Sequence, residues 1–222
     1  MTAHPVISSR KRRRFAWAGF SAALIALVTW RIYVASTFRP AKNFHEVDPG
    51  KFYRSAQLTG DEFSEAIRDY GIKTIINLRG ASPGEGWYDD EVRAAREQGV
   101  AHLNFGFSTK QVPHRTSLLP LLEALHTVRR PILVHCRSGA DRTSEVSAVY
   151  AMLYMGQTKE QAMRQLNLRY LYVEFFAPAK RLFVQDWQGE AWARDSYDPC
   201  LPKYAAYYDQ VADYCPTAFP KK

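Results

Sequence analysis

The chain has 222 residues, of which 46% are hydrophobic and 14% aromatic, and this composition excludes an intrinsically disordered protein. Its formal net charge of +8 comes mostly from residues 1–38, which hold six basic residues and no acidic one. The remainder carries 24 basic and 22 acidic residues, so we expect no nucleic-acid partner.

A basic cluster and an apolar stretch occupy the N-terminus. RKRRR at 10–14 precedes sixteen uncharged residues at 15–30. With continuation to Val34 and a snorkelling Arg31, a helix here would be about 30 Å long, the thickness of a hydrocarbon core. Basic residues favour the cytoplasmic side. We therefore expect a cytoplasmic tail and a single-pass anchor in the inner or plasma membrane, with the following domain periplasmic or otherwise extracytoplasmic.

Two other export signals fit the same residues. VAS at 34–36 resembles the small-residue site at which a signal peptide is cleaved. RRRF weakly resembles a twin-arginine signal. A buried core helix would not need the flanking positive charges, and each export interpretation places the rest of the chain outside the cytoplasm.

After this segment, predicted strands alternate with predicted helices. A linker at 39–50 carries a turn at Pro49-Gly50. The expected strands are 51–58, 72–78, 100–107 and 131–136. The expected helices are 59–71, 87–99, 117–128, 142–156, 158–166 and 173–187, the last broken or begun at Pro178. This alternation predicts an α/β fold with a mostly parallel central sheet flanked by helices. The predicted domains are 1–14 (basic tail), 15–37 (transmembrane signal anchor), 38–190 (main domain) and 191–222 (C-terminal extension).

An anion-binding loop is predicted between the strand at 131–136 and the helix that follows. Such a loop presents backbone N–H groups to a phosphate. The Arg142 guanidinium fits phosphate with two parallel hydrogen bonds, and with the helix dipole it should lower the thiol pKa of Cys136. Cys136 is therefore the predicted nucleophile. The predicted phosphate-binding residues are Arg137, Ser138, Gly139, Ala140 and Arg142.

The stretch HCRSGADRT at 135–143 resembles the signature of the cysteine-dependent protein-tyrosine and dual-specificity phosphatases. PGKFYRSAQLTGDEF and YGIKTIINLRG, further upstream, resemble bacterial dual-specificity-like members. The resemblance implies a phosphatase-like fold and a two-step hydrolysis through a phosphocysteine at Cys136, without metal or other cofactor. His135 should support the loop, and Thr143 or Ser138 should hydrogen-bond the sulfur as it leaves.

The general acid departs from the commoner family pattern. Such enzymes protonate the leaving oxygen, and most relatives use an aspartate on a loop well before the cysteine. Between residues 98 and 136 the only acidic residue here is Glu123, within a predicted helix. Asp141 is therefore the expected catalytic acid, and its place in the loop is similar to that in myotubularin-type phosphoinositide phosphatases. The alternative that Asp141 only shapes the loop stays open. The alternative acids are Glu85, Asp89 and Asp90.

The expected function is that of a membrane-anchored phosphomonoester hydrolase. Its substrate is either a lipid-linked phosphate or a protein carrying phosphotyrosine or phosphoserine. A rhodanese-like sulfurtransferase and a non-catalytic phosphate-binding module are the alternatives. In an exported domain, Cys200 and Cys215 are expected to pair in a disulfide, with two free thiols as the alternative.

Overall fold

The computed structural model describes residues 24–26, 29, 41–207 and 215. The chain divides into two units, Met1–Pro40 and Ala41–Lys222, and the sheet with its helices belongs to the second. The predicted anchor at 15–37 lies outside the described residues except for 24–26 and 29. Among the residues that are described, no helix is long and apolar enough to cross a membrane.

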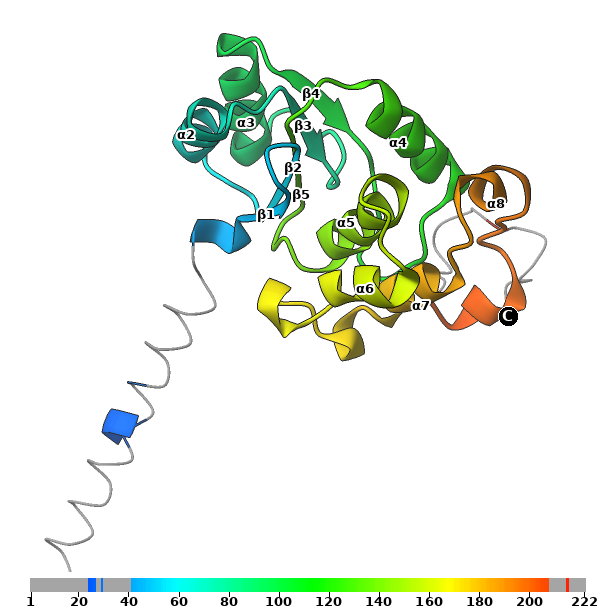
Figure 1. Ribbon diagram of the computed structural model, residues 1–222. Coiled ribbons are helices and arrows are strands. Elements are labelled where there is room, and N and C mark those ends of the chain that lie inside the picture. The colour runs from blue at the N-terminus through cyan, green and yellow to red at the C-terminus, as the bar shows by residue number, and fades with distance from the viewer. Residues whose placement is uncertain (1–23, 27–28, 30–40, 208–214, 216–222) are drawn as a thin grey trace, which may run out of the picture. The chain divides into compact units, whose positions relative to one another are not determined.

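One mixed sheet forms the centre of the second unit (Figure 1). In the described region five strands are arranged in the order β1-β2-β5-β3-β4. β2, β5, β3 and β4 run parallel, and β1 pairs with β2 in the antiparallel sense. This confirms the mostly parallel central sheet. The strands are β1 (His45–Asp48), β2 (Phe52–Ser55), β3 (Thr74–Asn77), β4 (Ala101–Asn104) and β5 (Ile132–His135).

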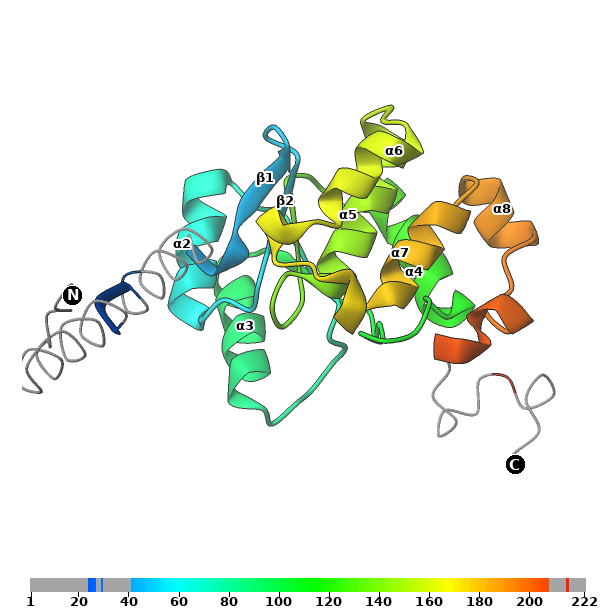
Figure 2. The ribbon, with the colours of Figure 1, turned by 90° about the horizontal axis from the view of Figure 1, so that it is seen from below.

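Helices cover both faces of the sheet. Figure 2 shows α2 and α3 on one side and α4, α5 and α7 on the other. The α-helices are α2 (Gly60–Tyr70), α3 (Gly86–Glu97), α4 (Arg115–Thr127), α5 (Asp141–Tyr154), α6 (Lys159–Ala162), α7 (Pro178–Asp186) and α8 (Glu190–Asp195). The 3-10 helices are η1 (Ala41–Asn43), η2 (Met163–Gln165), η3 (Leu168–Tyr170), η4 (Glu174–Phe176) and η5 (Pro202–Tyr207).

Side-chain alternation along the strands builds a separate core on each face. In β3, Ile75 packs in the cluster with α2 and α3, while Ile76 packs in the cluster with α4 and α5. In β5, Leu133 likewise packs in the cluster with α2 and α3, and Val134 packs in the cluster with α4 and α5. Because successive strand residues point to opposite faces, a strand covered on both sides is apolar along most of its length. This explains the uninterrupted apolar runs in the sequence.

The predicted linker at 39–50 is wrong as a description of this segment. It contains η1 and β1, and β1 forms a hairpin with β2 across the predicted turn at Pro49-Gly50. Within the turn, the amide of Lys51 donates to the carbonyl of Asp48 at 2.9 Å. The polar residues of β1 hid the strand, because a strand at the sheet edge needs little apolar surface.

Helix-boundary signals are accurate where a cap is present. Thr59 and Glu62 form a capping box at the start of α2, and Gly71 ends the helix in the left-handed conformation. Thr158 and Gln161 form the expected capping box, but α6 is only four residues long and continues as η2. The helix predicted over 173–187 begins at Pro178, after η4.

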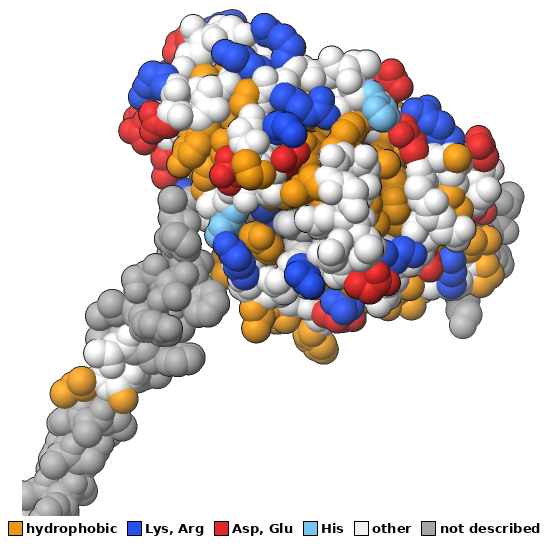
Figure 3. Space-filling view, in the orientation of Figure 1, with side chains coloured by type: hydrophobic (Ala, Val, Ile, Leu, Met, Phe, Trp, Pro, Cys, Tyr) orange, Lys and Arg blue, Asp and Glu red, His pale blue; other side chains and the backbone are white. Residues whose placement is uncertain are grey.

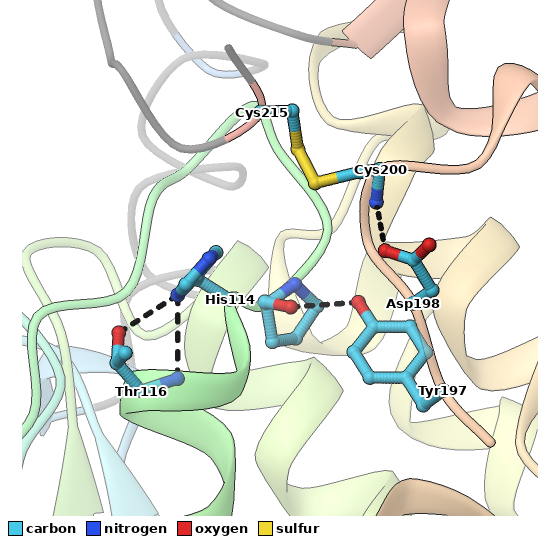
Figure 4. The surroundings of a disulfide bond; sticks show 7 residues. His114, Thr116, Tyr197, Asp198, Cys200 and Cys215 are labelled. Carbon is cyan, nitrogen blue, oxygen red and sulfur yellow. Dashed lines mark hydrogen bonds between the residues drawn. A yellow bond between two sulfur atoms is a disulfide. The ribbon is translucent and has the colours of Figure 1, made fainter. Parts of the chain in front are cut away.

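The segment predicted as a C-terminal extension contributes to the core of the main domain. Ala193, Tyr197 and Tyr204 are buried in the cluster that joins α5 to α7. The Tyr197 hydroxyl donates to the carbonyl of Pro113 at 2.6 Å. Close by, Cys200 and Cys215 form a disulfide (Figure 4).

Candidate active site

The predicted nucleophile lies at the carboxyl edge of the parallel strands. Ser55 of β2 and Asn77 of β3 both lie level with His135 of β5, so the residues after them meet at this edge. Cys136 follows directly and is 1% exposed. Residues 137–140 form a short loop, and α5 begins at Asp141. The strand, loop and helix expected from the sequence are therefore present, at the edge where open α/β sheets bind ligands.

Gly139 allows the loop to lie against the end of β2. Its φ of +67° belongs to the left-handed region, which side chains disfavour. A Cβ at this position would also lie 2.7 Å from the backbone nitrogen of Ala56 and 2.7 Å from the carbonyl oxygen of Ser55. Both conditions require glycine at this position.

Three consecutive backbone carbonyls of the loop, those of residues 137–139, accept hydrogen bonds from residues outside the loop. In chain order they accept from the Gln57 amide at 3.3 Å, the Asn43 side chain at 3.1 Å and the Arg54 guanidinium at 2.6 Å. A peptide N–H points away from its own carbonyl. Fixing these carbonyls outward therefore turns the loop N–H groups inward, where they can surround an anion.

Arg54 is the principal support of the loop, and sequence reasoning missed it. It lies in β2, fully buried, where it also donates to the Ser144 hydroxyl and the Gln165 side-chain oxygen, each at 2.8 Å. Its guanidinium stacks on the Tyr170 ring, 4.0 Å from the centroid. Burial lowers the pKa of Arg54 to about 10, despite the favourable charges of Tyr170 and Cys136. A charged residue inside a predicted strand, directly after Phe52 and Tyr53, was the available signal.

The predicted phosphate ligand Arg142 leaves part of its hydrogen-bonding capacity unused. One terminal nitrogen donates to the carbonyls of Leu78 at 3.2 Å and Phe107 at 3.4 Å. Its Nε is buried and has no partner in the described structure, and the same holds for the Thr143 hydroxyl. Buried polar groups are rarely left without partners, so these two donors suit the oxygens or sulfur of a substrate complex.

Asp141, the expected acid, occupies the first position of α5 and is partly buried. Burial raises its pKa, and the positive charges of Lys180 and Arg142 offset part of that effect. A raised pKa keeps more of the carboxyl group protonated and able to donate a proton.

The alternative acids have other surroundings. Glu85, Asp89 and Asp90 are all exposed. Asp89 accepts from the Gly84 amide at 3.2 Å, and Asp90 is paired with Arg93. Among these candidates, Asp141 is the one that directly follows the phosphate loop, at the start of α5.

A buried carboxylate behind the nucleophile was also missed. Glu91 of α3 is fully buried, and its Oε1 accepts from His135 and His102, each at 2.7 Å. Its Oε2 accepts from Gln57 at 2.9 Å. Burial alone would raise the pKa of Glu91, but the charge of His135 and these hydrogen bonds lower it to about 2. The expected supporting residue His135 is thus fixed by an ionised carboxylate immediately before Cys136.

A comparison with protein-family models identifies the family of this chain. A family model described as "DSP-PTPase phosphatase fused to NAD+ Kinase" matches residues 27–185. The chain belongs to this phosphatase family. It is a cysteine-dependent phosphatase of the tyrosine and dual-specificity type, as the resemblance in the sequence implied.

Individual relatives share the fold at low sequence identity. The catalytic core of the PP-IP phosphatase SIW14 from S. cerevisiae is 19% identical, with a TM-score of 0.56, over 68% of this chain and 88% of that one. TpbA from P. aeruginosa is 20% identical, with a TM-score of 0.54, over the same shares. A protein tyrosine phosphatase domain-containing protein from Bos taurus is 28% identical over 45% of this chain but only 14% of its own length.

Proposed function

We propose that this phosphatase hydrolyses phosphomonoesters through a covalent phosphocysteine at Cys136. The observation that carries the proposal is the loop itself: its carbonyls are held outward, and the Nε of Arg142, where the helix begins, has no partner within the described residues. This arrangement binds a phosphate dianion next to a thiol.

Each group has a defined task in the two steps. The Cys136 thiolate attacks phosphorus while the bond to the leaving oxygen breaks, and that oxygen takes the proton of Asp141. Water then attacks the phosphocysteine and gives a proton back to Asp141, which releases inorganic phosphate and the thiolate. The buried Thr143 hydroxyl can donate to the departing sulfur. Loop N–H groups and Arg142 stabilise the charge of the transferring group in both steps.

A lipid-linked phosphate is the substrate class we favour. Several large apolar side chains of segment 168–176 are exposed: Leu168 at 64%, Phe175 at 86% and Phe176 at 71%. Figure 3 shows orange apolar side chains at the lower edge of the molecule, over η3 and η4. Phe175 and Phe176 also line a groove of about 550 Å³ with Ser108, which directly follows the Arg142 partner Phe107. This surface and the apolar sequence at 15–30 suit an enzyme anchored in a membrane, with its catalytic domain outside the cytoplasm.

Phosphotyrosine in proteins is the second candidate substrate. It is favoured by the structure of the relative TpbA in complex with phosphotyrosine, which shares the fold of this chain. Parallel assays of a phosphotyrosine peptide and a vesicle-embedded lipid phosphate separate the two substrates. The sulfurtransferase and the non-catalytic module are not favoured by the family assignment.

Substitution of the nucleophile tests the proposed chemistry. Cys136→Ser should abolish hydrolysis while phosphate still binds, because a serine hydroxyl is a far weaker nucleophile at neutral pH. Arg142→Lys should also be nearly inactive, because an ammonium group cannot form the two parallel bonds of a guanidinium. Turnover is measured by phosphate release. Activity above about one hundredth of wild type in Cys136→Ser would show that sulfur is not the nucleophile.

The role of Asp141 is tested by comparing leaving groups. Asp141→Asn should slow alkyl or lipid phosphates by about 10²–10⁴-fold, the usual contribution of a general acid. Aryl phosphates with acidic leaving groups should lose much less, because they need little protonation. Equal losses for both substrates would mean that Asp141 only shapes the loop.

A further inference from the structure

Two arginines beside the phosphate loop have no ion-pair partner among the described residues. Arg79 follows β3, and Arg137 belongs to the loop itself. Within the described part of the chain, neither forms an ion pair with a carboxylate. The Arg142 guanidinium donates to the carbonyl of Leu78, the residue just before Arg79. Three cationic groups are therefore collected at the carboxyl edge of β3 and β5.

The Arg79 side chain is held in place by neutral partners. Its guanidinium lies over the Trp87 ring, 3.3 Å from the centroid, and donates to the side-chain oxygen of Gln57 at 2.8 Å. The backbone amide of the same Gln57 donates to the carbonyl of Arg137. Gln57 thus ties Arg79 to the phosphate loop without contributing a charge.

Glu91, a buried carboxylate near this cluster, forms no ion pair with Arg79 in the described part of the chain. Both Glu91 oxygens are already bonded, one by His102 and His135 and the other by Gln57. Gln57 lies between the carboxylate and the arginine, donating to the first and accepting from the second. The Arg79 guanidinium therefore donates no hydrogen bond to a carboxylate among the described residues, and a bound anion could accept one.

The electrostatics of Arg79 agree with this geometry. Burial lowers the pKa of Arg79, and the charges of Arg142 and Arg137 lower it further, while the charges of Glu91 and Cys136 offset part of this effect. A dianion bound among these side chains would relieve both the desolvation and the repulsion.

We propose that Arg79 and Arg137 form a second anion subsite, which binds another phosphate of the same substrate molecule. The subsite rests on the proposed function, because it is defined next to the phosphate that Cys136 attacks. The favoured substrates carry two phosphates on neighbouring carbons of a polyol. That chemistry occurs both in a lipid headgroup and in a free polyol phosphate.

The test compares one and two phosphates on the same soluble polyol. The full-length protein in detergent should hydrolyse inositol 4,5-bisphosphate with a kcat/KM at least about 10-fold above that of inositol 4-monophosphate, as expected for one charge-assisted contact. Arg79→Gln should reduce this preference by about 10- to 100-fold, and Arg79→Lys should restore part of it. Arg194→Gln, which removes one charge from exposed α8, is the matched control and should retain the preference.

A binding measurement keeps the subsite separate from the hydrolytic proposal. In Cys136→Ser, calorimetry should show tighter binding of the bisphosphate than of the monophosphate, and Arg79→Gln should remove that difference. Equal binding of the two ligands, or an equal loss for both in Arg79→Gln, would overturn the subsite. Discriminating binding without hydrolysis of any phosphate by the wild type would overturn the proposed function and retain the subsite.

Two further arms identify the source of the ligand. The same bisphosphate headgroup is presented free and in vesicles of phosphatidylcholine. Preference for the vesicle form supports a lipid substrate, and preference for the free form supports a soluble polyol phosphate. A stronger preference for an acidic phosphotyrosine peptide than for either would overturn the assignment of a second phosphate.

Discussion

The phosphate loop at 136–142 and the segment 168–176 are both irregular, but they relate to their surroundings in opposite ways. The loop is largely buried, and three of its carbonyls are fixed by neighbouring elements. The segment leaves most of the Phe175 and Phe176 side chains exposed. Tyr170 connects the two, since its ring stacks on Arg54 and its carbonyl accepts from Asn43. The irregular backbone of the phosphate loop is therefore fixed in place, as anion binding requires. The irregular backbone of segment 168–176 instead presents its side chains to the surroundings.

Gly139→Ala should have the largest effect, because it changes the phosphate loop, which is the more rigid of the two segments. The substitution adds a Cβ against β2 as well as strain at a positive φ, so we expect activity to fall more than about 100-fold and stability by about 1–3 kcal/mol. Phosphate release and thermal unfolding measure the two effects. Gly99→Ala, with nearly the same φ but open space around its Cβ, is the control. Similar losses in both variants would show that strain, not the close approach, explains the result.

Glu91→Gln should have an intermediate effect, which depends on pH. The pKa of Glu91 in the folded state, about 2, lies below its usual value, so its ionised form stabilises the fold above about pH 4.5. That contribution is lost as the pH falls from about 4.5 toward 2. We expect Glu91→Gln to lower the free energy of unfolding by about 1–3 kcal/mol at neutral pH. It should also remove the part of the acid dependence of that free energy that comes from Glu91. Denaturant unfolding across pH measures it.

Glu97→Gln is the matched control for that experiment, because Glu97 is exposed at the end of the same helix. If the two variants lose stability equally at neutral pH, the buried network around Glu91 does not stabilise the fold.

The double variant Phe175→Ser, Phe176→Ser should have the smallest effect on the folded domain. Exposed side chains contribute little to the stability of the fold, so the free energy of unfolding should change by less than about 0.5 kcal/mol. Hydrolysis of a lipid phosphate by the full chain in proteoliposomes should fall several-fold relative to hydrolysis of a soluble phosphate. The double leucine variant, which keeps the surface apolar, should retain the wild-type ratio. If the double serine variant keeps the wild-type ratio of lipid-phosphate to soluble-phosphate hydrolysis, this segment does not contact the lipid surface during catalysis.

The sequence was informative wherever structure depends on neighbours along the chain. The loop from Cys136 to Arg142, the apolar strands and the capping boxes at Thr59 and Thr158 all follow from local spacing. β1 was missed, because an edge strand needs no continuous apolar pattern.

The supports of the site were not predictable in the same way. Asn43, Arg54, Gln57 and Glu91 contact the loop, or His135 just before it, from positions 44 to 95 residues away in the sequence. No local pattern marks Asn43, Gln57 or Glu91. Their function depends on strand order, which places β2 and β3 on either side of β5. For Arg54, the sequence alone provides one signal, a charged residue inside a predicted strand.

The disulfide between Cys200 and Cys215 has a consequence for the nucleophile. The chain has three cysteines, so this pairing leaves Cys136 as its single free thiol. Alkylation of the native protein would therefore count active sites directly, with a stoichiometry of one label per chain. Because Cys136 is almost completely buried, small reagents should label it much faster than bulky ones. An oxidised Cys136 would also find no second thiol in its own chain, so its reduction would depend on an external donor.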